Sequence, residues 1–529
     1  MSATSRGRIP TELLSFFRSI GGHSLLIKGD AGTGKTTLAL QLIEELAEEQ
    51  PDYYMSTRVS DEALYRQFPW LEEKAKRNQV LRMGRAFLSK TKIKLPHDPS
   101  SDPKLRVAKD LLRALSTPDS ARVVARSELL KLEGQIEAGD IGREGALIKP
   151  ELDEETMVLD IGAILPELEL AYDVVEANLP KKTFMVLDSI DALAERYGFD
   201  PHRIMSTLQT DLVEKTGANI TYVMETSAKN IYDYMGDGVV RLYNEQDDGR
   251  RVRELIIEKL RGQRVDRWKY PFTLVDGRLR VFENYWLKMP DEMEKHASVP
   301  DPSKESLSTG NPSLDQMLKG GLPRGSLALL EIGEGVPQEC VRALEYVMIA
   351  DFLSKRRGVV WFPLFAINYS VLERHMKRLV GKDNLPFLKI LDKDSEITKG
   401  FDFVSVIEGS DATQDLRLNN LRYLLSSAQE PFLSVLGFDA LESAYGPDLL
   451  PQVNVHMEAM KRTGSVVLAE ATSDSACLKQ LGHRAHIHLK LESLAGTVML
   501  CGQKPHTTYH YLDFEGVKDK ITPELVPLV

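Results

Sequence analysis

The chain has 529 residues, a formal net charge of −11 and a sequence pI near 5.6. At about 100–200 residues per domain, this length predicts roughly two to four domains. The acidic balance excludes the global basic field on which general nucleic-acid binders depend. No apolar run approaches the roughly 18–20 residues that a membrane-spanning helix needs, and the first residues lack a signal-peptide core, so we expect a cytoplasmic protein. The three cysteines are too scattered for a disulfide framework or a metal cluster.

A phosphate-loop motif lies near the N-terminus, between a predicted strand and a predicted helix. The apolar run Ser24–Ile27 predicts a buried strand, and leucines and isoleucines at helical spacing follow from Leu38. Between them, GDAGTGKT (Gly29–Thr36) matches G-x-x-x-x-G-K-[ST]. This context predicts a site for a nucleoside triphosphate.

The residue types explain the chemistry of this loop. Its glycines let the main chain curl so that N–H groups face the phosphates, and the following helix adds its positive dipole end. Lys35 is expected to reach the β- and γ-phosphates, and the Thr36 hydroxyl to bind Mg²⁺. The candidate nucleotide-binding residues of the loop are Gly29, Asp30, Ala31, Gly32, Thr33, Gly34, Lys35, Thr36 and Thr37.

A second strand is predicted at Tyr53–Val59, and a long charged stretch follows it. Because this stretch is long for one crossover connection, we expect a helical insertion at about residues 70–165. The next strand, within TFMVLDSID (Thr183–Asp191), ends in Asp188. Downstream of a phosphate loop, such an acid orders the water shell of Mg²⁺. Asp188 and Thr36 are therefore the candidate metal ligands, and Asp188 and Lys35 are candidate catalytic residues.

Further strands are predicted at Asn219–Glu225, Asp237–Tyr243 and Arg253–Lys259, the last two joined by a polar turn at Asn244–Arg250. A polar, proline-bearing segment then predicts a linker at residues 289–302. We therefore divide the chain into a nucleotide-binding domain (residues 1–288), this linker and a second domain (residues 303–529).

The second half repeats the apolar scaffold of the first half without its chemistry. Gly325–Gly333 resembles the strand before the phosphate loop, and Val435–Gly446 resembles the strand that ends in Asp188. The residues that would contact phosphate, metal and nucleotide are replaced throughout. Gly34-Lys35-Thr36 is replaced by Gln338-Glu339-Cys340, Asp188 by Gly437, and the pair Lys259 and Arg261 by Met499 and Cys501. A glutamate at the loop would repel phosphate. Residues 303–529 are therefore predicted to form a degenerate pseudo-domain without nucleotide.

These motifs together resemble the RecA-superfamily ATPases of the KaiC, RadA and RadB type. The resemblance rests on GDAGTGKTT (29–37), VLDSIDAL (186–193), DGVVRL (237–242), EKLRG (258–262), YPFTL (270–274) and the opening STGNPSLDQMLKGGLPRGS (308–326). It implies an α/β fold of two tandem RecA-like P-loop NTPase domains, each a three-layer α/β/α arrangement with a mostly parallel sheet. It also implies ATP as the nucleotide. Lys259 and Arg261 match a pair that, in KaiC-like rings, reaches the nucleotide of the neighbouring subunit, which implies a homo-oligomer.

A narrower resemblance is to the GvpD family of archaeal gas vesicle regulatory proteins. It rests on the overall length, the lead-in IPTELLSFF (9–17), the stretch STRVS (56–60) and the degenerate second half. This resemblance implies a nucleotide-binding regulator that lowers the level or activity of a protein partner, a transcription activator.

One departure from the KaiC pattern bears on catalysis. KaiC-like enzymes place paired glutamates just after the second strand to activate the attacking water, whereas this chain has Ser56-Thr57-Arg58-Val59. Asp61 and Glu62 follow and could substitute only if the chain bends back, because a base must lie within about 3 Å of the water or act through another water. We therefore expect slow hydrolysis and a switch governed by nucleotide occupancy.

Two other classes stay open. A DNA-dependent recombinase or repair ATPase of the RadA/RadB type would need a basic strand-binding surface. The local basic clusters to test for such a surface are Lys90–Lys94 and Arg250–Arg253, and we expect both to be solvated faces. A KaiC-like autokinase is the third class, and the loss of the second phosphate loop argues against it.

Overall fold

The computed structural model describes residues 8–56, 65–66, 68–69, 166–197, 200–284, 289–290, 292–393, 400–417, 422–423, 425–446, 448–514 and 521–529. The predicted helical insertion at 70–165, the basic cluster Lys90–Lys94, and the candidate bases Asp61 and Glu62 lie outside these described residues.

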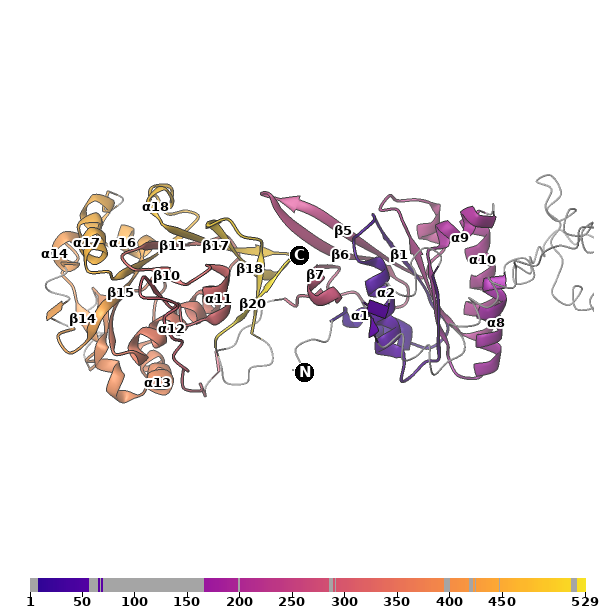
Figure 1. The fold of residues 1–529 in the computed structure, drawn as a ribbon, viewed down its shortest axis with the longest axis horizontal. Helices are drawn as coiled ribbons and strands as arrows, with labels where there is room; N and C mark the ends of the chain where they lie inside the picture. Colours follow the sequence, from indigo (N-terminus) through magenta and orange to yellow (C-terminus); the bar gives the residue numbers. More distant parts are fainter. Residues whose placement is uncertain are drawn as a thin grey trace, which may run out of the picture.

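In the described part of the first half, one sheet has the strand order β2-β3-β4-β1-β5-β6-β7-β8 (Figure 1). Strands β2 to β5 pair in parallel, whereas β6, β7 and β8 are added antiparallel. The strands are β1 (Ser24–Gly29), β2 (Asp52–Ser56), β3 (Phe184–Asp188), β4 (Asn219–Met224), β5 (Gly238–Asp247), β6 (Arg250–Leu260), β7 (Lys269–Thr273) and β8 (Arg280–Val281).

Helices cover both faces of this sheet, which makes three layers (Figure 1). The alternation along β1 explains this: Leu25 and Ile27 enter one apolar core, and Leu26 enters the core on the opposite face. The helices are α1 (Thr11–Arg18) and α2 (Lys35–Leu46) on the first face, and α8 (Pro166–Asn178), α9 (Ile190–Tyr197) and α10 (Pro201–Leu208) on the other.

The described second half repeats this arrangement. Its sheet has the order β14-β13-β12-β15-β16-β11-β17-β18-β19-β20, which matches the first sheet from β12 to β20 and adds two edge strands. The strands are β11 (Leu327–Ile332), β12 (Arg357–Phe362), β13 (Leu388–Asp392), β14 (Val404–Val406), β15 (Gln429–Gly437), β16 (Val466–Thr472), β17 (Ile487–Leu494), β18 (Thr497–Lys504), β19 (His510–Asp513) and β20 (Glu524–Pro527), beside the small pair β9 (Ser306–Leu307) and β10 (Leu322–Pro323). The predicted tandem RecA-like fold is therefore confirmed.

Helices again lie on both faces of the second sheet (Figure 1). They are α11 (Pro312–Met317), α12 (Gln338–Ser354) and α13 (Tyr369–Val380) on one side, and α14 (Ala412–Asp415), α16 (Phe438–Tyr445), α17 (Leu450–Arg462) and α18 (Leu478–Arg484) on the other. All three cysteines are buried. No helix within the described ranges has the length and apolar character to cross a membrane.

The two halves meet where β18–β20 approach β6–β8, and Figure 1 shows the yellow C-terminal strand β20 beside β7. Phe282 and Tyr511 stack there with ring centroids 4.4 Å apart, and Arg280 forms an ion pair with Asp513. Val252 shares one apolar cluster with residues of β18, β19 and β20. The boundaries proposed at 288 and 303 stay a prediction.

Two expectations for the β5–β6 hairpin are wrong. The strands extend through the predicted Asn244–Arg250 turn, because Asp247 pairs with Arg250 and only Asp248 and Gly249 turn the chain. Gly249 has a φ of 71°, which a turn this tight favours. The predicted solvated face at Arg250–Arg253 is also wrong, since Arg250 and Arg253 are 2% and 6% exposed. Both guanidinium groups are buried because they donate to main-chain oxygens of the second half.

Candidate functional site

The phosphate loop connects β1 to α2 through two positions that only glycine fits. A Cβ on Gly29 would lie 2.5 Å from the Leu242 carbonyl oxygen on β5. Gly34 adopts a φ of 102° immediately before α2. These two positions let the main chain leave the buried strand, curl and enter the helix within a few residues.

Lys35 curls back onto the loop. Its Nζ donates to the Asp30 carbonyl at 2.8 Å, and the Thr33 hydroxyl donates to the same oxygen at 2.9 Å. Ser227, after β4, donates to the Asp30 carboxylate at 2.9 Å. A bound phosphate would compete with the Asp30 carbonyl for Lys35, so the loop can exchange an internal contact for a ligand contact. Of the other loop residues, Ala31 and Gly32 are exposed and Thr37 is buried on α2.

Thr36 and Asp188 come together from positions 152 residues apart in the sequence, because α2 begins beside the end of β3. The Thr36 hydroxyl donates to Asp188 Oδ2 at 2.6 Å, and the Tyr54 hydroxyl donates to the same oxygen at 3.2 Å. A hydroxyl and a carboxylate are the oxygen ligands that Mg²⁺ prefers, alongside retained waters. The donor set therefore fits Mg²⁺, with Thr36 and Asp188 as the residues that could hold it.

Burial acts on both charged groups of this site. It raises the pKa of Asp188 above its ordinary value, against hydrogen bonds from Thr36 and Tyr54 that favour the carboxylate. Burial also lowers the pKa of Lys35. Four nearby carboxylates oppose this effect because they favour the charged ammonium, and in order of decreasing strength they are Glu225, Asp188, Asp30 and Asp191.

Two of these carboxylates, Glu225 and Asp191, were missed by sequence reasoning. Glu225 follows β4, which lies between β1 and β3, and its N–H donates to Asp191 Oδ2 at 2.7 Å. The strand order is the signal that was needed, because only the placement of β4 between the two motif strands brings Glu225 to the phosphate loop. Tyr54, on the adjacent β2, was missed for the same reason.

Lys259 and Arg261 lie away from the phosphate loop. Lys259 pairs with Val239 at the start of β5, and Arg261 Nη1 donates to Asp237 Oδ1 at 3.0 Å. Asp237 accepts in turn a hydrogen bond from Ser24, at the beginning of β1. The phosphate loop follows the other end of β1, and the two ends of this strand are roughly 16 Å apart at about 3.3 Å per residue. The pair and the loop of the same chain therefore face opposite ends of the sheet.

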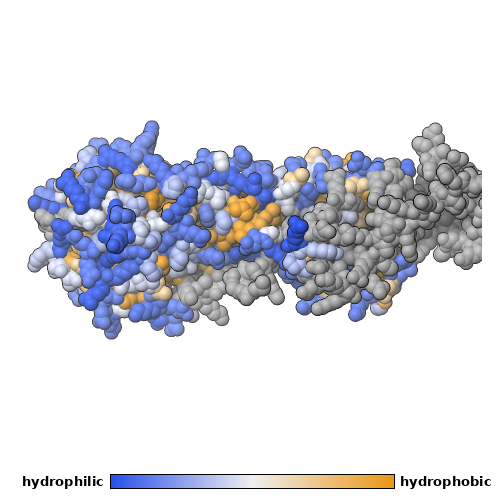
Figure 2. Space-filling model, viewed as in Figure 1, coloured by the Kyte–Doolittle hydropathy of each residue, from blue (hydrophilic) through white to orange (hydrophobic). Residues whose placement is uncertain are grey.

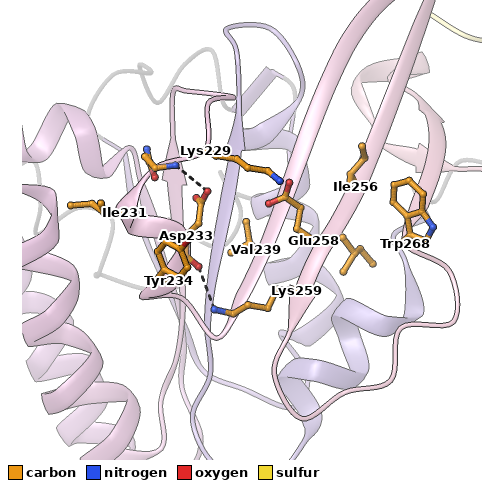
Figure 3. Close-up of a pocket in the computed structure, with 11 residues that line it drawn as sticks. Lys229, Ile231, Asp233, Tyr234, Val239, Ile256, Glu258, Lys259 and Trp268 are labelled. Carbon is orange, nitrogen blue, oxygen red and sulfur yellow. Dashed lines mark hydrogen bonds between the residues drawn. The ribbon is translucent and has the colours of Figure 1, made fainter.

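A pocket of about 850 Å³ lies around Lys259 (Figure 3). In Figure 3, Lys259 points toward Asp233 and Tyr234, and its Nζ donates to the Asp233 carbonyl at 3.3 Å. Burial and the neighbouring Arg261 lower the pKa of Lys259. The pocket rim carries apolar and aromatic side chains that are largely exposed: Ile231, Tyr234 and Trp268.

A buried charge network holds the wall of this pocket against β1. Lys28 Nζ lies 2.6 Å from Asp233 Oδ1, and Arg241 Nη2 lies 2.5 Å from Asp233 Oδ2. Both cations are essentially inaccessible. Lys28 also donates to the Ala228 carbonyl at 2.6 Å. Residues 228–234 are thereby fixed to the strand that carries the phosphate loop.

In the second half, the positions equivalent to the phosphate and metal residues hold no such groups. A Cβ on Gly437 would lie 2.4 Å from Leu364 Cα, so neighbouring main chain fills the place of the Asp188 side chain. Cys340 is buried on α12. The interior carries instead two buried carboxyl groups, Glu345 and Glu470, and burial together with the neighbouring Glu345 raises the pKa of Glu470 well above its ordinary value.

The fold and the loop define the class: this is a tandem RecA-like P-loop protein with one intact phosphate loop in the described residues. Residues 13–258 match the family model for the P-loop domain of the gas vesicle protein GvpD. This match covers somewhat less than half of the 529-residue chain and makes the first half similar to the GvpD P-loop domain.

Individual relatives show the same resemblance. Protein GvpD2 of Halobacterium salinarum is 25% identical over 525 residues, which cover 94% of this chain and 92% of that protein. Protein GvpD1 of the same organism is 27% identical over 359 residues, covering 67% of this chain and 56% of that protein. The circadian clock oscillator protein KaiC of Parathermosynechococcus lividus is 25% identical over 208 residues, covering 37% and 36%. The predicted resemblances to GvpD and to KaiC are both confirmed.

Proposed function

We propose that this protein is a Mg-ATP-dependent switch that hydrolyses ATP slowly and regulates a protein partner. ATP binds the loop Gly29–Thr37, with Lys35 on the β- and γ-phosphates. The observation that supports this most directly is the convergence of Lys35, Thr36 and Asp188 at one end of the sheet.

Mg²⁺ fits the pair Thr36 and Asp188, and a bound ion would neutralise phosphate charge there. The contacts of Lys35 and Ser227 then change the conformation of the loop. When phosphate binds, Lys35 donates to a phosphate oxygen in place of the Asp30 carbonyl. The main chain at Asp30 thereby loses one of its hydrogen bonds. Because Ser227 holds the Asp30 carboxylate, this change is transmitted to the segment after β4. A switch of this kind requires differential contacts in its two states, and this exchange supplies them.

Lys259 and Arg261 serve a neighbouring subunit in this proposal. Their distance from the loop of their own chain rules out a role at that nucleotide, whereas the exposed Arg261 and the open pocket around Lys259 are accessible to a second copy. The active form is therefore a homo-oligomer in which one subunit completes the site of another.

The regulated partner in this proposal is a transcription activator, with the protein acting as a GvpD-type repressor. The match of residues 13–258 to the GvpD P-loop domain supports this choice. A recombinase-type ATPase and a KaiC-like autokinase are the competing functions. Filter binding with single-stranded DNA tests the first, and mass spectrometry for phosphoserine or phosphothreonine tests the second.

The decisive experiment compares wild type with Lys35→Ala in nucleotide binding and in repression. Loss of Lys35 removes the cation from the phosphates, so both binding and repression should disappear. Survival of repression in this variant would refute the switch. Steady-state turnover on the same samples separates a slow ATPase from a brisk one, and brisk hydrolysis that Asp61→Ala or Glu62→Ala abolishes would contradict the occupancy switch.

A further inference from the structure

Arg253, on β6, joins the phosphate loop to the last residues of the second half. Its Nη1 donates to the Gly32 carbonyl at 3.0 Å, and its Nε donates to the Val529 main-chain oxygen at 2.6 Å. The side chain is buried between the halves. A guanidinium presents its donors in a rigid fork, so two acceptors fix its orientation. One side chain thus contacts both the nucleotide loop and the segment 524–529.

A second contact anchors that segment to the first half. The Thr273 hydroxyl, on β7, donates to the Pro527 carbonyl at 2.7 Å and accepts from the Val529 N–H at 3.3 Å. Thr273 is fully buried. Because β20 also pairs with β19, the segment is held by the second sheet on one side and by Thr273 and Arg253 on the other.

The contact with Gly32 affects the part of the loop that faces a phosphate. A peptide unit is planar and trans, so its C=O and the following N–H point in opposite directions. With the Gly32 carbonyl directed at Arg253, the Thr33 N–H is directed into the loop, where it lies 3.3 Å from the Asp30 carbonyl oxygen. Arg253 therefore orients a donor of the phosphate cradle by holding the opposite side of the same peptide unit.

Loss of either acceptor would disturb the other contact. If the segment 524–529 moved away, the buried Nε of Arg253 would be left without a partner, which is costly for a charged donor. The guanidinium would then reorient toward solvent and release Gly32. The reverse also holds, because a coupling free energy between two sites is reciprocal.

We propose that the segment 524–529 is an internal effector of the phosphate loop, with Arg253 as the positioning residue that couples them. Docking of the segment prepares the loop for the triphosphate, and triphosphate binding tightens the docking. The degenerate half is thereby a sensor of nucleotide state in the intact half. This inference rests on the proposed function, since it requires that the loop binds nucleotide.

The test uses two variants of the full chain that each delete one hydroxyl at the contact between the halves. Thr273→Val removes the anchor of the segment 524–529 without touching the loop. Tyr509→Phe removes a hydroxyl whose hydrogen-bond acceptors are the carboxylates of Asp247 at 3.1 Å and Glu492 at 2.8 Å, keeps the main-chain bond between Tyr509 and Leu528, and serves as the matched control. We expect affinity for a fluorescent ATP analogue with Mg²⁺ to fall about 5- to 10-fold in Thr273→Val, because both hydrogen bonds that anchor the segment through this hydroxyl are lost, and to stay unchanged in Tyr509→Phe.

A second readout follows the reverse direction. Amide hydrogen exchange in residues 524–529 should slow when Mg-ATP is added to wild type and should not respond in Arg253→Met. If the Thr273→Val and Tyr509→Phe proteins bound the ATP analogue with equal affinity, and Mg-ATP left amide exchange in residues 524–529 of wild type unchanged, the coupling would be overturned. The proposed function would not be affected by that result. A wild-type protein that binds no Mg-ATP would instead refute the proposed function.

Discussion

Asp233 is the anion that two buried cations share, and its removal should destabilise the first half strongly. Lys28 and Arg241 have side-chain exposures of 0% and 1%, and both contact the Asp233 carboxylate. Breaking a buried ion pair by deleting one partner costs about 3–5 kcal/mol, because an uncompensated charge stays behind. Glu258 remains beside Arg241 at 2.8 Å. We therefore expect Asp233→Ala to cost about 3 kcal/mol, the lower end of that range.

Calorimetry measures this effect as a shift of the melting temperature. At about 2–4 °C per kcal/mol for domains of this size, the expected fall is about 6–12 °C. Asp266→Ala is the matched control, since the pair between Arg264 and Asp266 is exposed at 87% and 70% and such pairs contribute at most about 1 kcal/mol. Equal shifts in the two variants would show that the buried network does not carry the stability assigned to it.

The pH dependence gives an independent check on the same residue. Burial alone would raise the pKa of Asp233, but hydrogen bonds from Lys28 and Asn230 and the charge of Arg241 lower it below its ordinary value of 3.8. A lowered acid pKa stabilises the fold above the unfolded value and loses that effect as pH falls through the folded value. The difference between wild type and Asp233→Ala should therefore be constant near neutral pH and should shrink below about pH 3.8.

Three further predictions concern catalysis, assembly and the second half. Glu225→Gln should keep nucleotide affinity and lower turnover about 100-fold if Glu225 is the base, and unchanged turnover would exclude it from that role. Mixing Lys35→Ala with Lys259→Ala should restore part of the turnover that each variant loses alone, because mixed oligomers contain some intact sites; no recovery would contradict completion by a neighbour. Because the pKa of Glu470 is raised, wild-type stability should fall as pH rises above the ordinary value of 4.5, by up to about 1.4 kcal/mol per pH unit, and Glu470→Gln should flatten this slope in urea unfolding.

The sequence predicted the sheet scaffold well because each strand carries its own apolar signal. The phosphate loop and Asp188 were also predictable, since their chemistry depends on local motifs in a fixed strand context. Arg253 was not, because a lone basic cluster looks the same whether it is solvated or donates to main-chain oxygens of a distant segment. Glu225 and Tyr54 depend on which strands are neighbours, and neighbour order is set by tertiary packing that no local pattern encodes.

The filled position beside Gly437 limits what a single substitution can introduce into the second half. An acid placed there would drive a new side chain into the main chain at Leu364, so the variant would lose stability before it gained a ligand. A metal ligand at this strand end therefore requires a concerted change in the segment around Leu364. Engineering a second nucleotide site in this half has to begin with that segment and not with the acid.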